Sequence, residues 1–272
     1  MTARRDVTRA LPLVQAARVV FDIALDQMVL SRRSLMAALL LSVPAALAAV
    51  YRIALWRGGI VDAPGPYDLY NRIVALYEVR NVVPIVALLY ATSLIADEVE
   101  GKTITYLFSR PVSRPAILAG KFAAYVATAL AAALPGVAAC FLLLATAPGA
   151  PGVAGGALDL VKDLGTIALA LVSYGALFTL LGALLRRPVI PSLLFLFPFE
   201  LVANLPGFMP RFTLTAYLRS LLRYQPAPEG PFPIAVDILP SGLCIGVILG
   251  ASVVFLAAAG LVFSRREFVL DQ

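Results

Sequence analysis

Three consecutive residues, Gly101-Lys102-Thr103, have the types and the order that end a phosphate-binding loop. The full pattern is Gly-x-x-x-x-Gly-Lys-Ser/Thr, and it follows a strand, so that backbone N–H groups can cradle the phosphates. Here Ala96 stands where the first glycine is required, and a long apolar run precedes the segment instead of a strand. We therefore predict that this chain binds no ATP by itself.

Other catalytic side chains are also scarce. The chain has no histidine, which excludes imidazole as a catalytic base or metal ligand. Cys140 and Cys244 both fall in apolar runs and are predicted to be small packing residues, not parts of a disulfide framework. Glu200 is the only carboxylate well inside a predicted span. We predict that the chain is not an enzyme and holds no cofactor or metal, with an intramembrane protease or lipid transferase as a less favoured alternative.

The composition indicates a membrane protein. Of the 272 residues, 61% are hydrophobic and only 14% are charged, whereas soluble domains carry about 25% charged residues. The apolar residues gather in six runs, and about 20 such residues suffice to span a bilayer. Each run must be helical, because lipid offers no partner to backbone polar groups. We predict an all-α protein with a transmembrane domain over residues 34–264, whose spans lie at about 34–56, 76–96, 116–147, 164–185, 188–207 and 238–264.

The distribution of positive charge predicts the orientation. The net charge is +6, and an arrangement with the N-terminus in the cytoplasm places 14 of the 22 Lys and Arg residues on the cytoplasmic side. This bias is the one that the positive-inside rule describes, so the basic balance needs no nucleic-acid partner. We predict a multi-pass protein of the bacterial cytoplasmic (inner) membrane with both termini in the cytoplasm, residues 265–272 forming a short cytoplasmic tail.

The N-terminal region, residues 1–33, is predicted to contain a cytoplasmic amphipathic helix. Between residues 10 and 31, apolar residues recur at spacings of three and four: Val14, Ala17, Phe21, Leu25 and Met28. Polar residues form another stripe: Gln15, Arg18, Asp22 and Asp26. Such a helix suits the membrane interface, and packing on a soluble partner is the alternative.

Two regions are predicted to lie on the outer side. The segment Gly58 to Asn71 contains Pro64, Gly65 and Pro66 and is predicted to be a short loop. Between the last two spans, apolar residues at helical spacing over 214–222 predict a short helix. Aromatic residues near the span ends are predicted to form the interface belt: Tyr51, Trp56, Tyr67, Tyr70 and Tyr224.

The segment between the second and third predicted spans has a pattern of its own. Acidic residues cluster over 97–100, just before Gly101. Residues 102–110 then resemble about two turns of amphipathic helix, with Ile104, Leu107 and Phe108 on one side. Pro111 ends that helix, since proline lacks an N–H and clashes with the preceding turn. A short helix held between two spans on the membrane surface is what a mechanical coupling element requires.

This segment also carries a sequence resemblance. An acidic cluster is followed by Gly101, Thr103, Leu107, Arg110-Pro111-Val112-Ser113-Arg114, Ile117 and Gly120-Lys121. The order resembles the signature of ABC-2 type transporter permeases. The layout of the whole chain is similar to that family too: an amphipathic N-terminal helix, six spans, a first cytoplasmic loop with a coupling helix, and outer helical elements between spans five and six.

The resemblance implies a transmembrane permease subunit of an ABC transporter, in which two copies, or two related permeases, form the substrate pathway among membrane lipids. It implies a cytoplasmic ATP-binding subunit, present in two copies, which binds ATP and magnesium and contacts the coupling helix. Export is the direction it implies. The predicted contact residues are Glu98, Glu100, Gly101, Thr103, Ile104, Leu107, Phe108, Arg110, Pro111 and Arg114. A non-transporting membrane anchor or sensor subunit is the alternative function, and nothing in the sequence selects a substrate.

Glu200 and Asn204 are the candidate residues of the translocation path, because the fifth span borders that path in ABC-2 permeases. At about 1.5 Å per residue, Glu200 lies about 18 Å from Pro188, beyond the midplane of the bilayer. Ionisable residues at such depths usually face an interior or a cavity. Asn204 lies one turn further on the same face. The alternative is a short fifth span in which Glu200 already reaches the outer headgroups.

Overall fold

Long apolar runs with few charges fold into helices along the chain. The computed structural model describes residues 13–29, 31–58, 64–92, 94, 114–185, 188–203, 208–224 and 238–265, and all regular structure among them is helical. The prediction of an all-α protein is therefore confirmed for these residues. The helices are α1 (Leu13–Val29), α2 (Arg32–Trp56), α3 (Pro66–Arg72), η1 (Ile73–Val82), α4 (Val83–Ala91), α7 (Arg114–Ala145), α8 (Gly152–Leu184), α9 (Val189–Ala203), η2 (Met209–Phe212), α10 (Leu214–Leu221) and α11 (Ser241–Arg265).

Five helices of the described part are long and apolar enough to cross a membrane. They are Arg32–Trp56, Pro66–Ala91, Pro115–Ala145, Gly152–Leu184 and Ser241–Arg265. The predicted fifth span, 188–207, contains α9, which has 15 residues. At about 1.5 Å per residue α9 is about 22 Å long, less than the roughly 30 Å of the hydrocarbon core. The count of six spans therefore stays a prediction.

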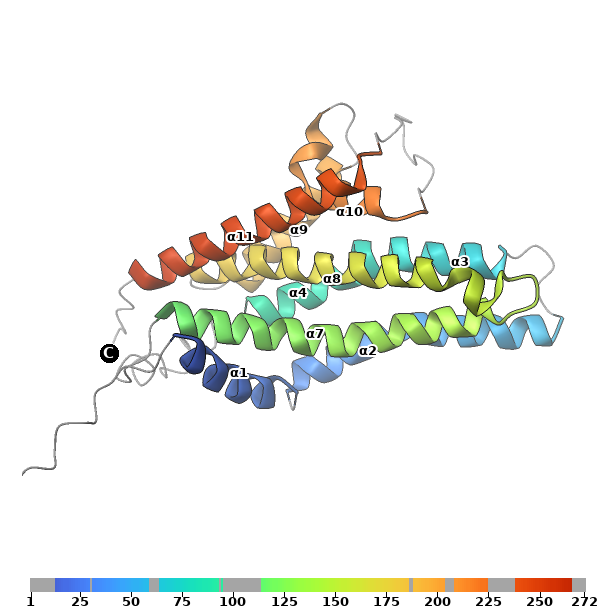
Figure 1. The fold of residues 1–272 in the computed structure, drawn as a ribbon, viewed down its shortest axis with the longest axis horizontal. Coiled ribbons are helices and arrows are strands. Elements are labelled where there is room, and N and C mark those ends of the chain that lie inside the picture. Colours follow the sequence, from blue (N-terminus) through green and yellow to red (C-terminus); the bar gives the residue numbers. More distant parts are fainter. Residues whose placement is uncertain are drawn as a thin grey trace, which may run out of the picture.

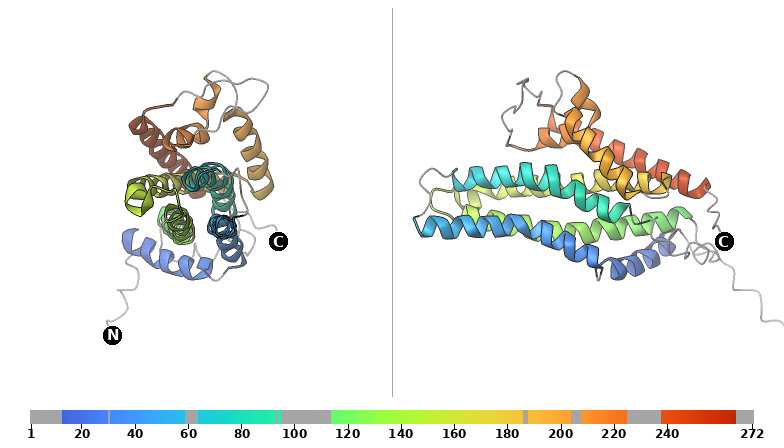
Figure 2. Two further views of the ribbon diagram at one scale, coloured as in Figure 1. Left: turned by 90° about the vertical axis from the view of Figure 1, so that its right-hand side faces the viewer. Right: turned by 180° about the vertical axis from the view of Figure 1, so that it is seen from behind.

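The long helices run side by side along one axis (Figure 1). The helices α7 and α8 lie at the centre, with α2 and α1 packed on α7, and α4 and α11 packed on α8. Viewed from the end, α1 lies on one side of the bundle, and α9, α10 and α11 lie on the other (Figure 2). The core is thus built around the α7–α8 hairpin.

The two ends of the bundle differ. The first residue of α1 and the last residue of α11 lie at one end, here called the terminal end, where α4 ends and α7 begins (Figures 1 and 2). The α7–α8 turn lies at the other, the hairpin end. The segment 95–113, which is outside the described residues, therefore connects two helices at the end where α1 begins and α11 ends. The assignment of this end to the cytoplasm stays a prediction.

The α7–α8 hairpin is longer than a bilayer is thick. The 33 residues of α8 correspond to about 50 Å at 1.5 Å per residue, against roughly 30 Å of hydrocarbon. The turn between the helices has Gly149 and Gly152 at φ values of 82° and 80°, a region that glycine enters without a steric cost. If the apolar run 164–185 fills the hydrocarbon, the first turns of α8 project beyond it.

The helices differ in how much of their surface they bury. The percentages below are the buried share of an apolar 18-residue stretch in each helix. The share is 67% in Pro66–Ala91 and 61% in Gly152–Leu184, but 22% in Arg32–Trp56 and 17% in Ser241–Arg265. The second and fourth long helices are therefore internal, whereas α2 and α11 are peripheral. Large apolar side chains remain exposed on both peripheral helices, as suits a lipid-facing surface: Leu35, Leu39, Val50, Leu243, Val253 and Leu261.

The predicted N-terminal helix is present as α1, with its polar stripe exposed and its apolar stripe half-buried except for Val14, while the most buried residues lie beside that stripe. Val14, which belongs to the predicted apolar stripe, is 78% exposed, whereas Ala16 and Ala24 are buried. The reason is a close approach to α7, where a Cβ atom at Gly120 would lie only 2.5 Å from the backbone oxygen of Ala17. Small side chains on α1 permit this contact. The location of α1 in the membrane interface stays a prediction.

The second long helix corrects two predictions. It begins at Pro66, so the region predicted as a loop up to Asn71 is partly helical. Proline suits a first helical turn, because no N–H is needed there. Tyr70, predicted to belong to the interface belt, is 0% exposed and packs edge-on against Phe141 at a centroid distance of 5.4 Å. Its ring therefore belongs to the core.

A short helix was predicted after the fifth apolar run, and one is present there, while its location on the outer side stays a prediction. The short helix between the last spans is α10, which begins after Thr213, whose side chain accepts a hydrogen bond from the N–H of Ala216. It packs on α8 and α11, and Leu218 is fully buried. Cys140 and Cys244 are both buried, unpaired thiols in the core.

Candidate functional site

Of the ten residues predicted to contact an ATPase, only Arg114 is among the described residues. Nine of them fall outside the described residues: Glu98, Glu100, Gly101, Thr103, Ile104, Leu107, Phe108, Arg110 and Pro111. Arg114 is the first residue of α7. The structure therefore shows the two helix ends that hold this segment, and the contacts around those ends define the candidate site.

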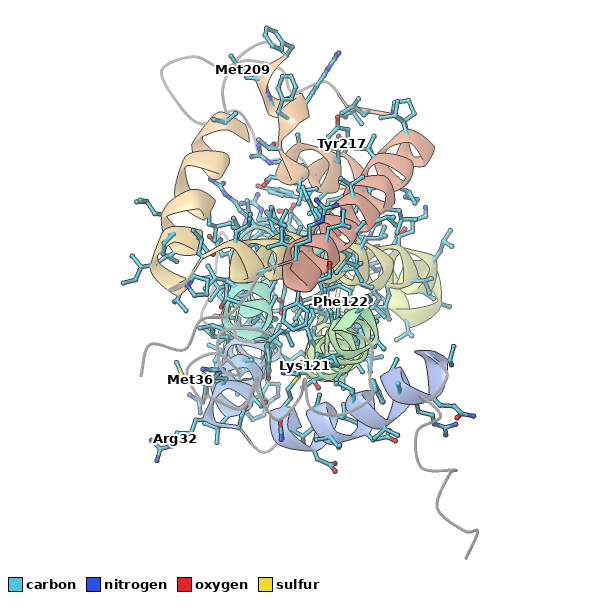
Figure 3. The ribbon with its side chains drawn as sticks, turned by 90° about the vertical axis from the view of Figure 1, so that its left-hand side faces the viewer. Arg32, Met36, Lys121, Phe122, Met209 and Tyr217 are labelled. Carbon is cyan, nitrogen blue, oxygen red and sulfur yellow. The ribbon has the colours of Figure 1, made fainter. Side chains whose placement is uncertain are left out.

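Lys121 connects the two ends of the segment. Lys121 lies seven residues after the start of α7. Its ammonium group donates a hydrogen bond to the backbone oxygen of Leu94 at 3.1 Å. Figure 3 shows Lys121 on α7, between α1 and α11, both of which contact α7. A cation at a helix C-terminus satisfies a carbonyl group that has no helical partner. The end of the second long helix is thereby fixed to the third.

A second group of polar contacts ties α4 to the junction of α1 and α2. Ser31 caps α2, and its hydroxyl also donates to the backbone oxygen of Met28 at 2.9 Å. The hydroxyl of Ser34 donates to the same oxygen. Tyr90 of α4 donates to the Ser34 hydroxyl at 2.8 Å. Because α1, α2 and α4 meet at one cluster, none of them can move far without the others.

Close packing joins α4, α7 and α8 in this half of the bundle. The Tyr125 hydroxyl of α7 donates to the Leu171 oxygen of α8 at 2.8 Å. A Cβ atom at Gly175 would lie 2.2 Å from the Tyr125 ring, and one at Gly182 would lie 3.0 Å from the Thr92 oxygen. Interiors packed at this density transmit displacement rather than absorb it. The helices on either side of residues 95–113, α4 and α7, thus belong to one stiff frame.

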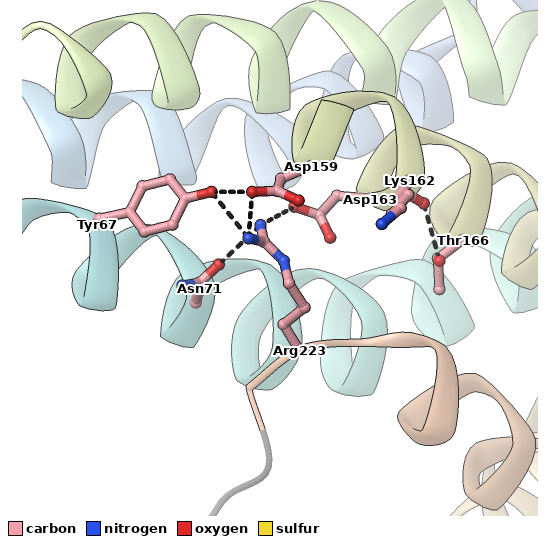
Figure 4. Close-up of polar contacts among 7 residues, drawn as sticks. All are labelled: Tyr67, Asn71, Asp159, Lys162, Asp163, Thr166 and Arg223. Carbon is pink, nitrogen blue, oxygen red and sulfur yellow. Dashed lines mark hydrogen bonds and ion pairs between the residues drawn. The ribbon is translucent and has the colours of Figure 1, made fainter. Parts of the chain in front are cut away.

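A polar cluster lies toward the hairpin end, on α3, α8 and the residue two past α10. It consists of Tyr67, Asn71, Asp159, Asp163 and Arg223 and is called the Arg223 cluster below (Figure 4). Tyr67 donates to Asp159 at 2.5 Å, and Arg223 donates to Tyr67 at 2.8 Å and to Asn71 at 3.4 Å. Arg223 also forms an ion pair with Asp159, and its Nη2 lies 3.8 Å from Asp163 Oδ2.

The charges of the Arg223 cluster favour one another. Burial lowers the pKa of Arg223, but the hydrogen bond to Tyr67 and the charges of Asp159 and Asp163 outweigh it and raise the pKa above the ordinary value. The guanidinium also lies over the Tyr67 ring, 5.3 Å from its centre, which is a favourable cation–π geometry. The cluster therefore fastens the segment after α10 to two internal helices.

Glu78 corrects the prediction that Glu200 is the only carboxylate well inside a span. It lies in η1, in the middle of the helix Pro66–Ala91, and is 0% exposed. The two path candidates are not tested: Glu200 is in α9 with a side chain outside the described part, and Asn204 is outside the described residues. Asp159 and Asp163 were also missed. Their spacing of four, just before the apolar run 164–185, was a usable signal.

These features together define a multi-pass, helical membrane protein, without a metal-binding group of three or more His, Cys, Asp or Glu among the described residues. A family model described as ABC-2 family transporter protein matches residues 78–268. This is more than half of the chain, and the protein belongs to that family. The match begins at Glu78 and leaves α1, α2 and α3 outside it. Among curated proteins, none matches the chain.

Proposed function

We propose that this protein is the permease subunit of an ABC exporter and is driven by a separate ATP-binding subunit. Membership of the ABC-2 family supports a permease. The observation that carries the proposal is the frame at the terminal end, in which Lys121 binds Leu94 across the segment 95–113. A partner that moves this segment acts on α4 and α7 together.

The proposed mechanism uses the packing of the bundle. ATP and magnesium, held by two copies of the partner, draw those copies together and shift the segment 95–113. The displacement reaches α8 through its contacts with α4 and α7, and reaches α1 and α2 through α7. The path then opens against a second permease copy or a related permease, with Glu200 and Asn204 as path residues. The largely exposed surfaces of α2 and α11 leave room for lipids or that second copy.

The experiment separates coupling from stability. The protein is reconstituted in vesicles with the ATPase that co-purifies with it, and ATP hydrolysis and thermal stability are measured. Lys121→Met removes the bond to Leu94 but keeps the apolar stem, so we expect hydrolysis to lose its dependence on the permease. Lys162→Met, on the exposed surface of α8 near the hairpin end, is the matched control.

A second variant addresses the segment itself. Leu107→Ala is expected to weaken co-purification with the ATPase, because Leu107 is a predicted contact residue. The proposal is wrong if no ATPase co-purifies from membranes, or if a cysteine at position 107 reacts only with reagents added from the side opposite to the ATP. An ATPase that binds the protein without any transport would instead support the anchor or sensor function.

A further inference from the structure

Glu78 is a carboxylic acid enclosed by the bundle. Its side chain is 0% exposed, and both of its carboxyl oxygens lack a hydrogen-bond partner. An isolated ionised carboxylate in apolar surroundings carries a large desolvation cost. Buried polar groups in native proteins are nearly always partnered. An acid placed in this way therefore needs a ligand that neutralises it.

The backbone around Glu78 is unusual. Ile73–Val82 forms a π-helix, in which the N–H of Val83 bonds to the oxygen of Glu78. Segments of π-helix are rare and occur often at functional sites. Glu78 is seven residues from Asn71, hence at most about 10 Å deeper than the Arg223 cluster at 1.5 Å per residue. It lies on an internal helix that links the hairpin end to the frame at the terminal end.

Among the described residues, no positively charged side chain forms a hydrogen bond with the Glu78 carboxylate. The titratable groups within electrostatic range are Tyr77 of the same helix and Cys140 of α7. The Tyr77 hydroxyl donates to the backbone oxygen of Leu40 on α2 at 3.1 Å. The described Lys and Arg residues, including Arg80 of the same helix and Arg72 of α3, make no hydrogen bond to Glu78. The charged residues of α8 are Asp159, Lys162 and Asp163, and both aspartates belong to the Arg223 cluster.

The choice of ligand follows from the lining. Calcium and magnesium need about six or more oxygen ligands, and the described residues contain no group of three His, Cys, Asp or Glu that could hold a metal. Two near neighbours could contribute ligands. Cys140 supplies a single thiol, and the Tyr77 hydroxyl already donates to the Leu40 oxygen. A proton needs only the carboxylate itself. It satisfies the charge without further ligands.

A chain of buried polar groups leads toward the hairpin end. Tyr70 lies within electrostatic range of both Asp163 and Cys140, and Cys140 lies within range of Glu78. The Tyr70 hydroxyl and Asp163 Oδ2 are buried and lack hydrogen-bond partners, as Glu78 does. Unpartnered polar atoms of this kind mark places where water can bridge. The route Asp163, Tyr70, Cys140 and Glu78 connects the Arg223 cluster with the centre of the bundle.

We propose that Glu78 is a proton-binding site in the interior of the bundle, in exchange with the hairpin-end side through Tyr70 and Asp163. The site does not depend on the ATPase partner. It gives the permease a group whose charge can change without any change in the nucleotide. Because Glu78 lies in the π-helix, loss of its proton places a charge at the point where the second long helix departs from regular α-geometry.

The test is infrared spectroscopy of the purified full-length protein in lipid. A protonated carboxyl group has a C=O stretch apart from that of a carboxylate, and it shifts when water is replaced by D₂O. We expect a shifting band in the wild type that is lost in Glu78→Gln, which keeps the shape of the side chain. Asp68→Asn is the matched control, since Asp68 is 44% exposed and paired with Arg72. It should leave the band unchanged.

Several outcomes would overturn the proposal. Identical carboxyl bands in wild type and Glu78→Gln show that no proton is held, and loss of the band on addition of Na⁺ or Li⁺ shows a metal site instead. Tyr70→Phe removes one hydroxyl from the route and is expected to slow deuterium exchange of the band by about tenfold; an unchanged rate refutes the route. If Glu78→Gln does not fold, dicyclohexylcarbodiimide, which adds to protonated carboxyl groups in apolar sites, must label wild-type Glu78. Absence of that label refutes the site.

Discussion

Replacement of Arg223 by alanine tests whether the Arg223 cluster fastens the segment after α10 to the bundle. The change leaves Asp159 and Asp163, with side chains 20% and 6% exposed, without their cation. Breaking a buried ion pair costs about 3–5 kcal/mol, and an exposed pair contributes about 0–1 kcal/mol. Arg223 itself is 35% exposed, so we expect an intermediate loss of about 2 kcal/mol in the free energy of unfolding.

The two buried thiols provide the assay. Cys140 and Cys244 are both fully buried, so a fluorogenic maleimide reports unfolding of the detergent-solubilised protein when it gains access to them. The control is Arg72→Ala, which removes an exposed pair with Asp68 and a contact with the Tyr224 ring. We expect this control to cost about 0.5 kcal/mol.

A third variant tests the physical cause. If the cost of Arg223→Ala comes from leaving carboxylates unpaired, then Asp159→Asn and Asp163→Asn, added together, should recover about half of it. Equal destabilisation by Arg223→Ala and Arg72→Ala would refute the reasoning. So would a loss of stability that the two asparagines fail to reduce at all.

Two further predictions concern glycines that permit close packing. Gly175→Ala places a Cβ atom 2.2 Å from the buried Tyr125 ring. It is expected to lower the free energy of unfolding by about 1–3 kcal/mol in the same thiol assay. In the control, Gly165→Ala on the same helix, the added Cβ atom meets nothing within 4 Å, so the change should be neutral or stabilising by up to about 1 kcal/mol. Gly120→Ala pushes against the backbone oxygen of Ala17, so trypsin should release α1 faster than from wild type or the Gly165→Ala control; an unchanged cleavage rate would show that α1 does not depend on this contact.

Much of the helical layout was predictable, because lipid imposes a simple rule on apolar runs. The second long helix shows where the rule fails. Glu78 and Arg80 limit the uncharged run to 81–96, and hydropathy extended the predicted span back only to about residue 76, whereas the helix begins at Pro66. A helix surrounded by other helices can carry such residues, because protein rather than lipid is its neighbour. Hydropathy cannot distinguish those two environments.

The functional residues divide in the same way. The family signature around Gly101 and Lys121 is local in sequence, and it indicated the family that the comparison then showed. The partner of Lys121, a backbone oxygen 27 residues away, required the fold. The Arg223 cluster is harder still, because Arg223 and Tyr67 are 156 residues apart. Separations of that size are set by packing, which no local pattern records.

The length of the α7–α8 hairpin has a practical consequence. If the apolar run 164–185 fills the hydrocarbon, the tip stands clear of the lipid, where two continuous helices hold it and the chain turns through two glycines with positive φ. A small folded tag inserted between Gly149 and Gly152 would therefore be displayed on a stiff arm at a fixed distance from the bilayer. In particle images, such an arm would be a landmark from which to determine the orientation of the protein.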